Sequence, residues 1–167
     1  VLPSARAMCI DESLGEKGIL TALAATAYHA IRVGPAPDLI VGHGILGRML
    51  ARLTIASGAP APTVWETDAN RRDATAYTVI DPAADTRRDY HTICDASGSA
   101  EVLDDLLGRL SKGGEIVLAG FYDRISFAFP PAFMREARLR IAAEFTPEDV
   151  ASTTMLIETG ALSLDGL

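Results

Sequence analysis

The chain has 167 residues, of which 49% are hydrophobic and 22% are charged, and it carries a net charge of −7 at pH 7. This length supports one domain with its own core, and the composition is ordinary for a globular protein. The acidic balance, with no basic stripe to offset it, argues against nucleic acid as a partner. The apolar runs are too short for a transmembrane segment.

The cysteines, Cys9 and Cys94, form neither a C-x-x-C pair nor a disulfide framework, and Cys94 is expected to be a small buried residue. With no visible signal peptide, the chain is predicted to be cytoplasmic. It does not begin with Met, and residues 160–167 look like chain about to continue. We therefore expect a domain excised from a longer two-domain enzyme, with residues 1–13 as a leader and residues 14–167 as the folded unit.

The first predicted elements are a helix, a strand and a second helix. Residues 19–33 are rich in Ala and Leu and apolar almost all round, which predicts a helix buried beside a sheet. An apolar strand over residues 38–42 runs into a glycine-rich turn, and a helix is predicted from Arg48 to about Ser57. The turn reads Gly42-His43-Gly44-Ile45-Leu46-Gly47.

Five further strands are predicted at 63–66, 77–80, 92–95, 115–120 and 139–145. A weak helix over 69–76, capped by Asp68, is expected between the second and third strands, and a loop or single turn over 83–90. Apolar residues at helical spacing predict a helix over 100–110. A proline-interrupted loop should precede the sixth strand, and Thr146 should cap a last helix ending near Thr159.

Alternating strands and helices with short connections define the fold class as α/β. They predict a doubly wound, mostly parallel six-stranded sheet of the Rossmann type, with helices on both faces. In such a sheet the ligand crevice lies outside the carboxyl ends of the strands.

The spacing of Gly42, Gly44 and Gly47 is that of a G-x-G-x-x-G dinucleotide-binding turn, in the strand-to-helix context that this motif requires. A merely tight turn is the alternative. Glu66, followed by Thr67, ends the next strand about twenty residues on, where an acid binds ribose hydroxyls. Its charge would repel a 2′-phosphate, which favours NAD over NADP, although the neighbouring arginines 71 and 72 leave NADP open.

Other candidate cofactor contacts follow the fourth and fifth strands, with ordinary loop chemistry as the alternative. They are Ala96, Ser97, Gly98, Gly120 and Phe121. The side chain of His43 is expected to point to solvent or to the crevice mouth, while its backbone binds. Three scattered histidines and two distant cysteines give no zinc spacing, so no metal site and no catalytic residue are assigned.

The order of these pieces resembles the nucleotide-binding half of the medium-chain dehydrogenase/reductase superfamily, over about residues 14–167. The resemblance is carried by residues 21–30, 41–47, 95–98, 112–121 and 160–162. Within that superfamily, residues 14–18, 23–30 and 64–67 are similar to those of the bacteriochlorophyllide dehydrogenases.

This resemblance implies an NAD-dependent oxidation of the 3-(1-hydroxyethyl) group of a bacteriochlorophyllide, a tetrapyrrole, to 3-acetyl. It places the pyrophosphate on the N–H groups of Ile45 and Leu46, the adenosine ribose on Glu66, and the nicotinamide at the loop after Gly120. The catalytic base and any zinc would belong to an N-terminal domain that this chain lacks. The chain alone is thus expected to bind NAD(H) weakly without turnover, and to form a homodimer through the edge near 139–145.

Two other functions stay open. An S-adenosylmethionine-dependent methyltransferase also has a glycine-rich first turn and an acid after the second strand, but it would need a further antiparallel strand. A non-catalytic dinucleotide-binding module, such as a redox sensor, needs nothing beyond the crevice itself.

Overall fold

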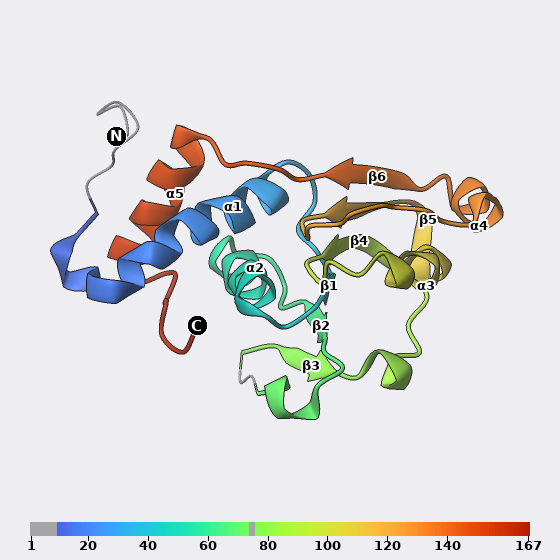
Figure 1. Ribbon diagram of the computed structural model, residues 1–167, viewed down its shortest axis with the longest axis horizontal. Coiled ribbons are helices and arrows are strands. Elements are labelled where there is room, and N and C mark those ends of the chain that lie inside the picture. The colour runs from blue at the N-terminus through green and yellow to red at the C-terminus, as the bar shows by residue number, and fades with distance from the viewer. Residues whose placement is uncertain (1–9, 74–75) are drawn as a thin grey trace.

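The computed structural model describes residues 10–73 and 76–167, and at its centre lies a six-stranded sheet (Figure 1). The described strands are all parallel and lie in the order β3-β2-β1-β4-β5-β6. Their bounds are β1 Leu39–Val41, β2 Thr63–Trp65, β3 Thr78–Ile80, β4 Tyr90–Asp95, β5 Leu110–Leu118 and β6 Arg138–Ile141. The predicted Rossmann sheet is confirmed.

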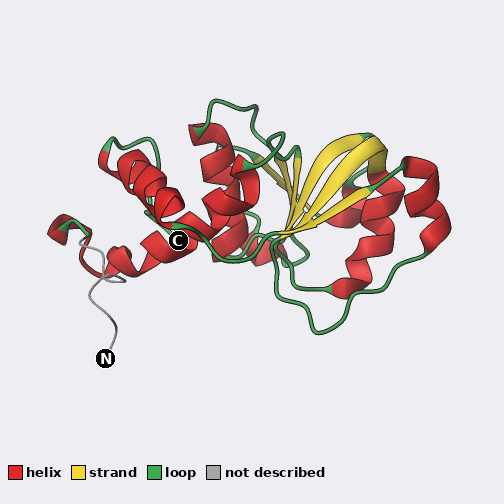
Figure 2. Cartoon of the chain, turned by 90° about the horizontal axis from the view of Figure 1, so that it is seen from above, coloured by secondary structure: helices red, strands yellow, loops and turns green. Residues whose placement is uncertain are grey.

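Helices cover both faces of the sheet, as Figure 2 shows. Helices α1, α2 and α5 pack together on one side, and α3 and α4 on the other. Their bounds are α1 Leu20–Arg32, α2 Ile45–Ala56, α3 Leu103–Arg109, α4 Phe129–Arg135 and α5 Pro147–Glu158. Among the described residues, none of these helices combines the length and the apolar character that crossing a bilayer demands.

Side chains along the strands alternate between two apolar cores. One core, shared with α1, α2 and α5, takes Ile40, Val64, Cys94 and Val117 from four neighbouring strands. The other takes the strand residues between them and closes against α3 and α4 through leucines such as Leu106. Because parallel strands are buried on both faces, they read as continuous apolar runs in the sequence. The predicted burial of Cys94 is confirmed.

The order of the strands reverses at β1, which pairs with β2 on one side and β4 on the other. The last pairs of these strands join Val41 to Trp65 and Val41 to Asp95, so the three strands end level with one another. In open α/β sheets this reversal opens a crevice outside the carboxyl ends of the strands. The residues that follow β1, β2 and β4 therefore meet at one edge.

Several predicted boundaries were wrong. Strand β5 spans Leu110–Leu118 rather than 115–120, and β4 begins at Tyr90 rather than Thr92. Helix α2 begins at Ile45 rather than Arg48, because Gly44 already serves as its N-cap. The helix expected over 69–76 is one 3-10 turn, Ala69–Arg71, capped by Asp68 as predicted; residues 74 and 75 lie outside the described residues. Strand β6 stops at Ile141 rather than residue 145, because its partner β5 ends opposite it at Leu118.

The loop predicted before the sixth strand contains helix α4. Its two prolines, Pro130 and Pro131, occupy the first turn, where no backbone N–H is needed for an intrahelical bond. Prolines therefore start this helix instead of excluding it. The single turn at Pro82–Ala84 and the capping box of Thr146 and Asp149 on α5 agree with the sequence-based expectations.

Candidate cofactor site

The glycine turn joins β1 to α2 and keeps its backbone close to the end of β4. Gly42 has a φ of 94°, in the left-handed region that favours glycine, and a Cβ there would lie 3.2 Å from the Cα atom of Ser97. A Cβ on Gly47 would lie 1.8 Å from the carbonyl oxygen of Gly42. Only glycine at position 47 therefore lets α2 pack this close to the turn.

The N-terminus of α2 meets this turn without a side-chain cap and without an acidic residue in its first turn. The backbone N–H groups of Ile45 and Leu46 lie at the start of the helix, where no intrahelical acceptor exists for them. The helix dipole adds partial positive charge at the same place. This end of α2 is thus suited to hold an anionic group such as a phosphate.

Glu66 directly follows β2, and its carboxylate lies against the glycine turn. The Oε2 atom accepts a hydrogen bond from the backbone N–H of His43 at 3.2 Å, and Oε1 accepts one from the N–H of Asp68 at 2.9 Å. The Nε atom of Arg71 lies 3.7 Å from Oε2. Although the residue is only 7% exposed, the carboxylate retains lone pairs that can accept from a ligand's hydroxyls.

The side chain of His43 was expected to point to solvent or to the crevice mouth, and the first of these was wrong. The residue is fully buried, with Nδ1 2.5 Å from the carbonyl oxygen of Arg71 and Nε2 2.9 Å from the hydroxyl of Tyr77. Burial lowers the pKa of His43, although the hydrogen bond to the Arg71 carbonyl opposes this shift. Its partners lie far along the chain, so no local pattern indicates them.

The loops after β4 and β5 touch each other through glycine. A Cβ on Gly120 would lie 2.7 Å from the backbone nitrogen of Gly98, and a Cβ on Gly98 would lie 3.2 Å from the carbonyl oxygen of Phe121. The side chain of Phe121 is 96% exposed. The two loops thus form one continuous wall with an aromatic side chain at its rim.

Asp95 is a buried carboxyl group that the sequence analysis did not single out. It is the last residue of β4, and its Oδ1 atom accepts hydrogen bonds from the N–H of Ser97 at 2.9 Å and from its hydroxyl at 2.6 Å. Its Oδ2 atom is buried with no partner among the described residues. Burial raises the pKa of Asp95, against the hydrogen bonds from Ser97. Its position at the end of an apolar strand is the signal that was available.

Two open hollows at this edge collect most of the predicted residues. The first, of about 550 Å³, is lined in part by Gly42, His43, Gly44, Glu66, Thr67, Ala96 and Ser97. The second, of about 450 Å³ at the ends of β5 and β6, includes Gly120 and Phe121. Gly98 contacts Phe121 between them, and Ile45, Leu46 and Gly47 form the helix start behind Gly44. These volumes are typical of small-molecule sites.

Arg71, which the sequence suggested only as a possible contact to NADP, lines the first hollow. Sequence reasoning missed residues 142–144, which follow β6 and line the second hollow together with Thr26 of α1. Residues 142–144 were hidden because the sixth strand was predicted to continue through them. Within residues 10–73 and 76–167, no group of three or more His, Cys, Asp or Glu side chains is arranged to hold a metal ion.

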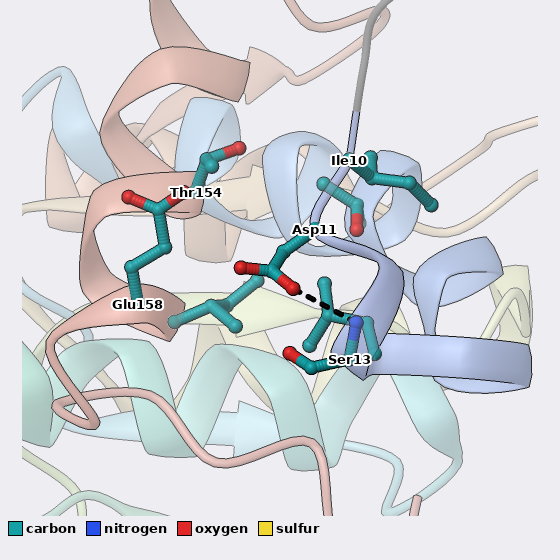
Figure 3. A pocket seen from close by; sticks show the side chains of 8 residues that line it. Ile10, Asp11, Ser13, Thr154 and Glu158 are labelled. Atoms are coloured by element: carbon teal, nitrogen blue, oxygen red, sulfur yellow. Dashed lines mark hydrogen bonds between the residues drawn. The ribbon is translucent and has the colours of Figure 1, made fainter.

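Another hollow lies away from this edge, between the segment before α1 and the C-terminal part of α5 (Figure 3). Asp11 and Glu158 are among its lining residues, and Asp11 accepts a hydrogen bond from the N–H of Ser13 at 2.8 Å. None of the predicted cofactor contacts lines it. The predicted residues therefore meet at the carboxyl edge of the sheet and not here.

No family model matches the chain. It is 61% identical over its whole length to 2-desacetyl-2-hydroxyethyl bacteriochlorophyllide A dehydrogenase of Cereibacter sphaeroides, and 58% identical to the protein of the same name from Rhodobacter capsulatus. Each match covers 54% of the relative, so the chain spans about half the length of these curated relatives.

Among solved structures, a protein of Sinorhizobium meliloti described as a zinc-binding dehydrogenase, bound to NADP, superposes with a TM-score of 0.83 at 19% identity. This match covers 98% of the chain and 55% of that protein. It shows a shared fold, while the whole-length identity to the two curated proteins shows kinship. The chain is thus similar over its whole length to the bacteriochlorophyllide dehydrogenases, and it shares the fold of a zinc-binding dehydrogenase.

Proposed function

We propose that this chain is the cofactor-binding half of an NAD-dependent oxidoreductase of bacteriochlorophyll biosynthesis. The reaction is oxidation of the 3-(1-hydroxyethyl) group of a bacteriochlorophyllide to a 3-acetyl group. The cofactor assignment rests on the uncapped start of α2, which lies beside a glycine turn and the carboxylate of Glu66. The substrate class rests on the whole-length similarity to the two curated dehydrogenases.

The residues present fit a dinucleotide. The missing Cβ atoms of Gly42 and Gly47 let the turn pack against the loop after β4 and against α2, and the N–H groups of Ile45 and Leu46 would bind the pyrophosphate. Glu66 would accept from the adenosine ribose, and the wall formed by Gly98 and Gly120 would position the nicotinamide. When bound, NAD supplies the hydride acceptor, and the chain's own residues bind and orient it. The base that removes the hydroxyl proton is assigned to the other half of the protein.

The preference for NAD follows from charge at the ribose. Glu66 is nearly buried, so its negative charge would repel a 2′-phosphate at close range. Arg71, whose side chain is 50% exposed, is the group that could accept such a phosphate, but its Nε atom already faces Glu66 at 3.7 Å. The carboxylate therefore favours ribose hydroxyls, and the related fold that was solved with NADP makes this preference worth measuring.

Titration with NADH and NADPH, followed by cofactor fluorescence, tests the assignment. We expect wild-type protein to bind NADH about tenfold more tightly, which is about 1.4 kcal/mol. Glu66→Ala should weaken NADH binding and narrow the difference in affinity between NADH and NADPH. Glu16→Ala, which removes an exposed carboxylate, should leave both affinities unchanged. Equal affinity of the wild type for both cofactors would defeat the role of Glu66.

The methyltransferase alternative finds no support in the sheet. The strands of the described residues are all parallel, and the further antiparallel strand that this alternative needs is not among them. A non-catalytic dinucleotide-binding module would have the same cofactor site as the proposed dehydrogenase, so the site itself does not distinguish the two functions. Binding of S-adenosylmethionine without NADH binding would reverse this preference.

A homodimer through the free edge of β6 is part of the proposal. Within residues 10–73 and 76–167 this strand pairs with β5 alone, and at its end Ile141 is 75% exposed. An open strand edge offers unpaired backbone groups to a second copy. Sedimentation equilibrium should give the mass of two chains. The mass of one chain at micromolar concentration would contradict the pairing.

A further inference from the structure

The imidazole of His43 uses both of its ring nitrogens inside the protein. The carbonyl oxygen of Arg71 can only accept, so Nδ1 carries the proton and donates to it at 2.5 Å. Nε2 then accepts from the hydroxyl of Tyr77 at 2.9 Å, and the two rings meet edge to face with centroids 5.6 Å apart. The ring is thus held in one neutral tautomer between two partners.

The charges around the imidazole come from three directions. Arg48 of α2 lowers the pKa of His43, while Asp73 and Glu66 raise it, and burial lowers it more than any of these charges. Arg48 also donates to the carbonyl oxygen of His43 at 3.3 Å and to Asp73 at 2.6 Å. A neutral ring at pH 7 agrees with the tautomer that its two partners require.

These contacts fasten the segment between β2 and β3 onto the glycine turn. Within the described part of that segment, regular structure is limited to the 3-10 turn Ala69–Arg71, so it depends on side chains for its position. Its other side is tied by Arg72, which donates to the carbonyl oxygens of Glu66 and Thr67, each at 2.7 Å. His43 provides the matching attachment on the side that faces the crevice.

We propose that His43 is a positioning residue for the adenosine end of the dinucleotide, acting through Arg71 and Glu66. This inference rests on the proposed function for its ligand. Fixing the Arg71 carbonyl fixes the backbone from which the guanidinium extends, and its Nη2 atom lies 3.2 Å from the place of a Cβ on Gly44. The N–H of His43 holds Glu66 from the same turn. Groups held before the ligand arrives lose less conformational entropy on binding.

The test measures NADH affinity in variants of the whole protein. His43→Leu removes both ring contacts and should raise the Kd for NADH about tenfold, because Arg71 and Glu66 would no longer be held in place before the ligand arrives. His43→Asn retains a donor near the Arg71 carbonyl and should recover part of the affinity. Tyr77→Phe should give a smaller loss than His43→Leu. The exposed His91→Leu is the matched control and should bind as wild type does.

A double-mutant cycle separates positioning from simple stability. If His43 acts through Arg71, the double variant His43→Leu/Arg71→Ala should raise the Kd for NADH by less than the product of the two single-variant increases. A lower melting temperature with unchanged NADH affinity in folded His43→Leu would show that the residue only fills the core. Failure of the wild type to bind NADH would instead refute the proposed function.

Discussion

Replacing Gly47 with alanine is expected to abolish NADH binding and to lower the melting temperature by about 6–12 °C. The new Cβ would lie 1.8 Å from the carbonyl oxygen of Gly42, so backbone must move against backbone and no rotamer change relieves the contact. Overpacking costs about 1–3 kcal/mol and occasionally more, and we expect about 3 kcal/mol here. For a domain of this size each kcal/mol shifts the midpoint by about 2–4 °C. Thermal unfolding by circular dichroism and NADH titration measure the two effects.

Gly108→Ala is the matched control, because Gly108 lies inside α3 and a Cβ there would meet nothing within 4 Å. Alanine is favoured over glycine inside a helix by roughly 1 kcal/mol, so this variant should melt slightly higher and bind NADH normally. A Gly47→Ala protein that melts within about 2 °C of the wild type would mean that α2 does not approach the turn this closely.

Local patterns were enough to predict the sheet and one wall of the crevice. The strands are short apolar runs, and the helices between them have apolar residues at helical spacing, so element type follows from periodicity. The glycine turn and Glu66 could be placed together because parallel strands end at a common edge. The structure brings Gly42, Glu66 and Ser97 to one hollow, as expected.

What the sequence could not predict depends on partners that are distant along the chain. The orientation of His43 is set by Arg71 and Tyr77, which lie 28 and 34 residues further on. Residues 142–144 line the second hollow because β6 ends at Ile141, and that end is set by the pairing of Ile141 with Leu118 of β5. Helix α4 was hidden because proline is read as a breaker unless its position within the first turn is known.

The second large effect is expected away from the cofactor, at the junction of α1 and α5. Asp149 is fully buried in the first turn of α5. Its Oδ2 atom accepts from the N–H of Thr146 and lies 2.7 Å from Nδ1 of His29, while Oδ1 lies 2.5 Å from Nε of Arg32. One carboxylate thus completes the helix cap and joins two helices of the same face.

Asp149→Ala should therefore lower the melting temperature by about 4–8 °C, since losing the cap hydrogen bonds and the ion pair to the partly exposed Arg32 costs about 2 kcal/mol. The folded Asp149→Ala protein should still bind NADH with wild-type affinity, in contrast to Gly47→Ala, because the junction of α1 and α5 lies outside the cofactor crevice. Asp165→Ala, which removes an exposed carboxylate paired with Lys17, is the control and should change stability little. Equal melting temperatures for Asp149→Ala and Asp165→Ala would show that the buried carboxylate does not stabilise the junction.

The stability difference between wild type and Asp149→Ala should depend on pH, because the Asp149 carboxyl group titrates. Burial alone would raise the pKa of Asp149, but hydrogen bonds from Thr146 and His29 and the charge of Arg32 hold it below its usual value. Because the pKa of this carboxyl is lower in the folded than in the unfolded state, the carboxylate stabilises the protein above about pH 4. This stabilisation is lost as the pH falls further. The gap between wild type and Asp149→Ala should therefore be widest near neutral pH and shrink in acid. A gap that stays constant from pH 7 to pH 3 would assign the loss to packing rather than to the charge.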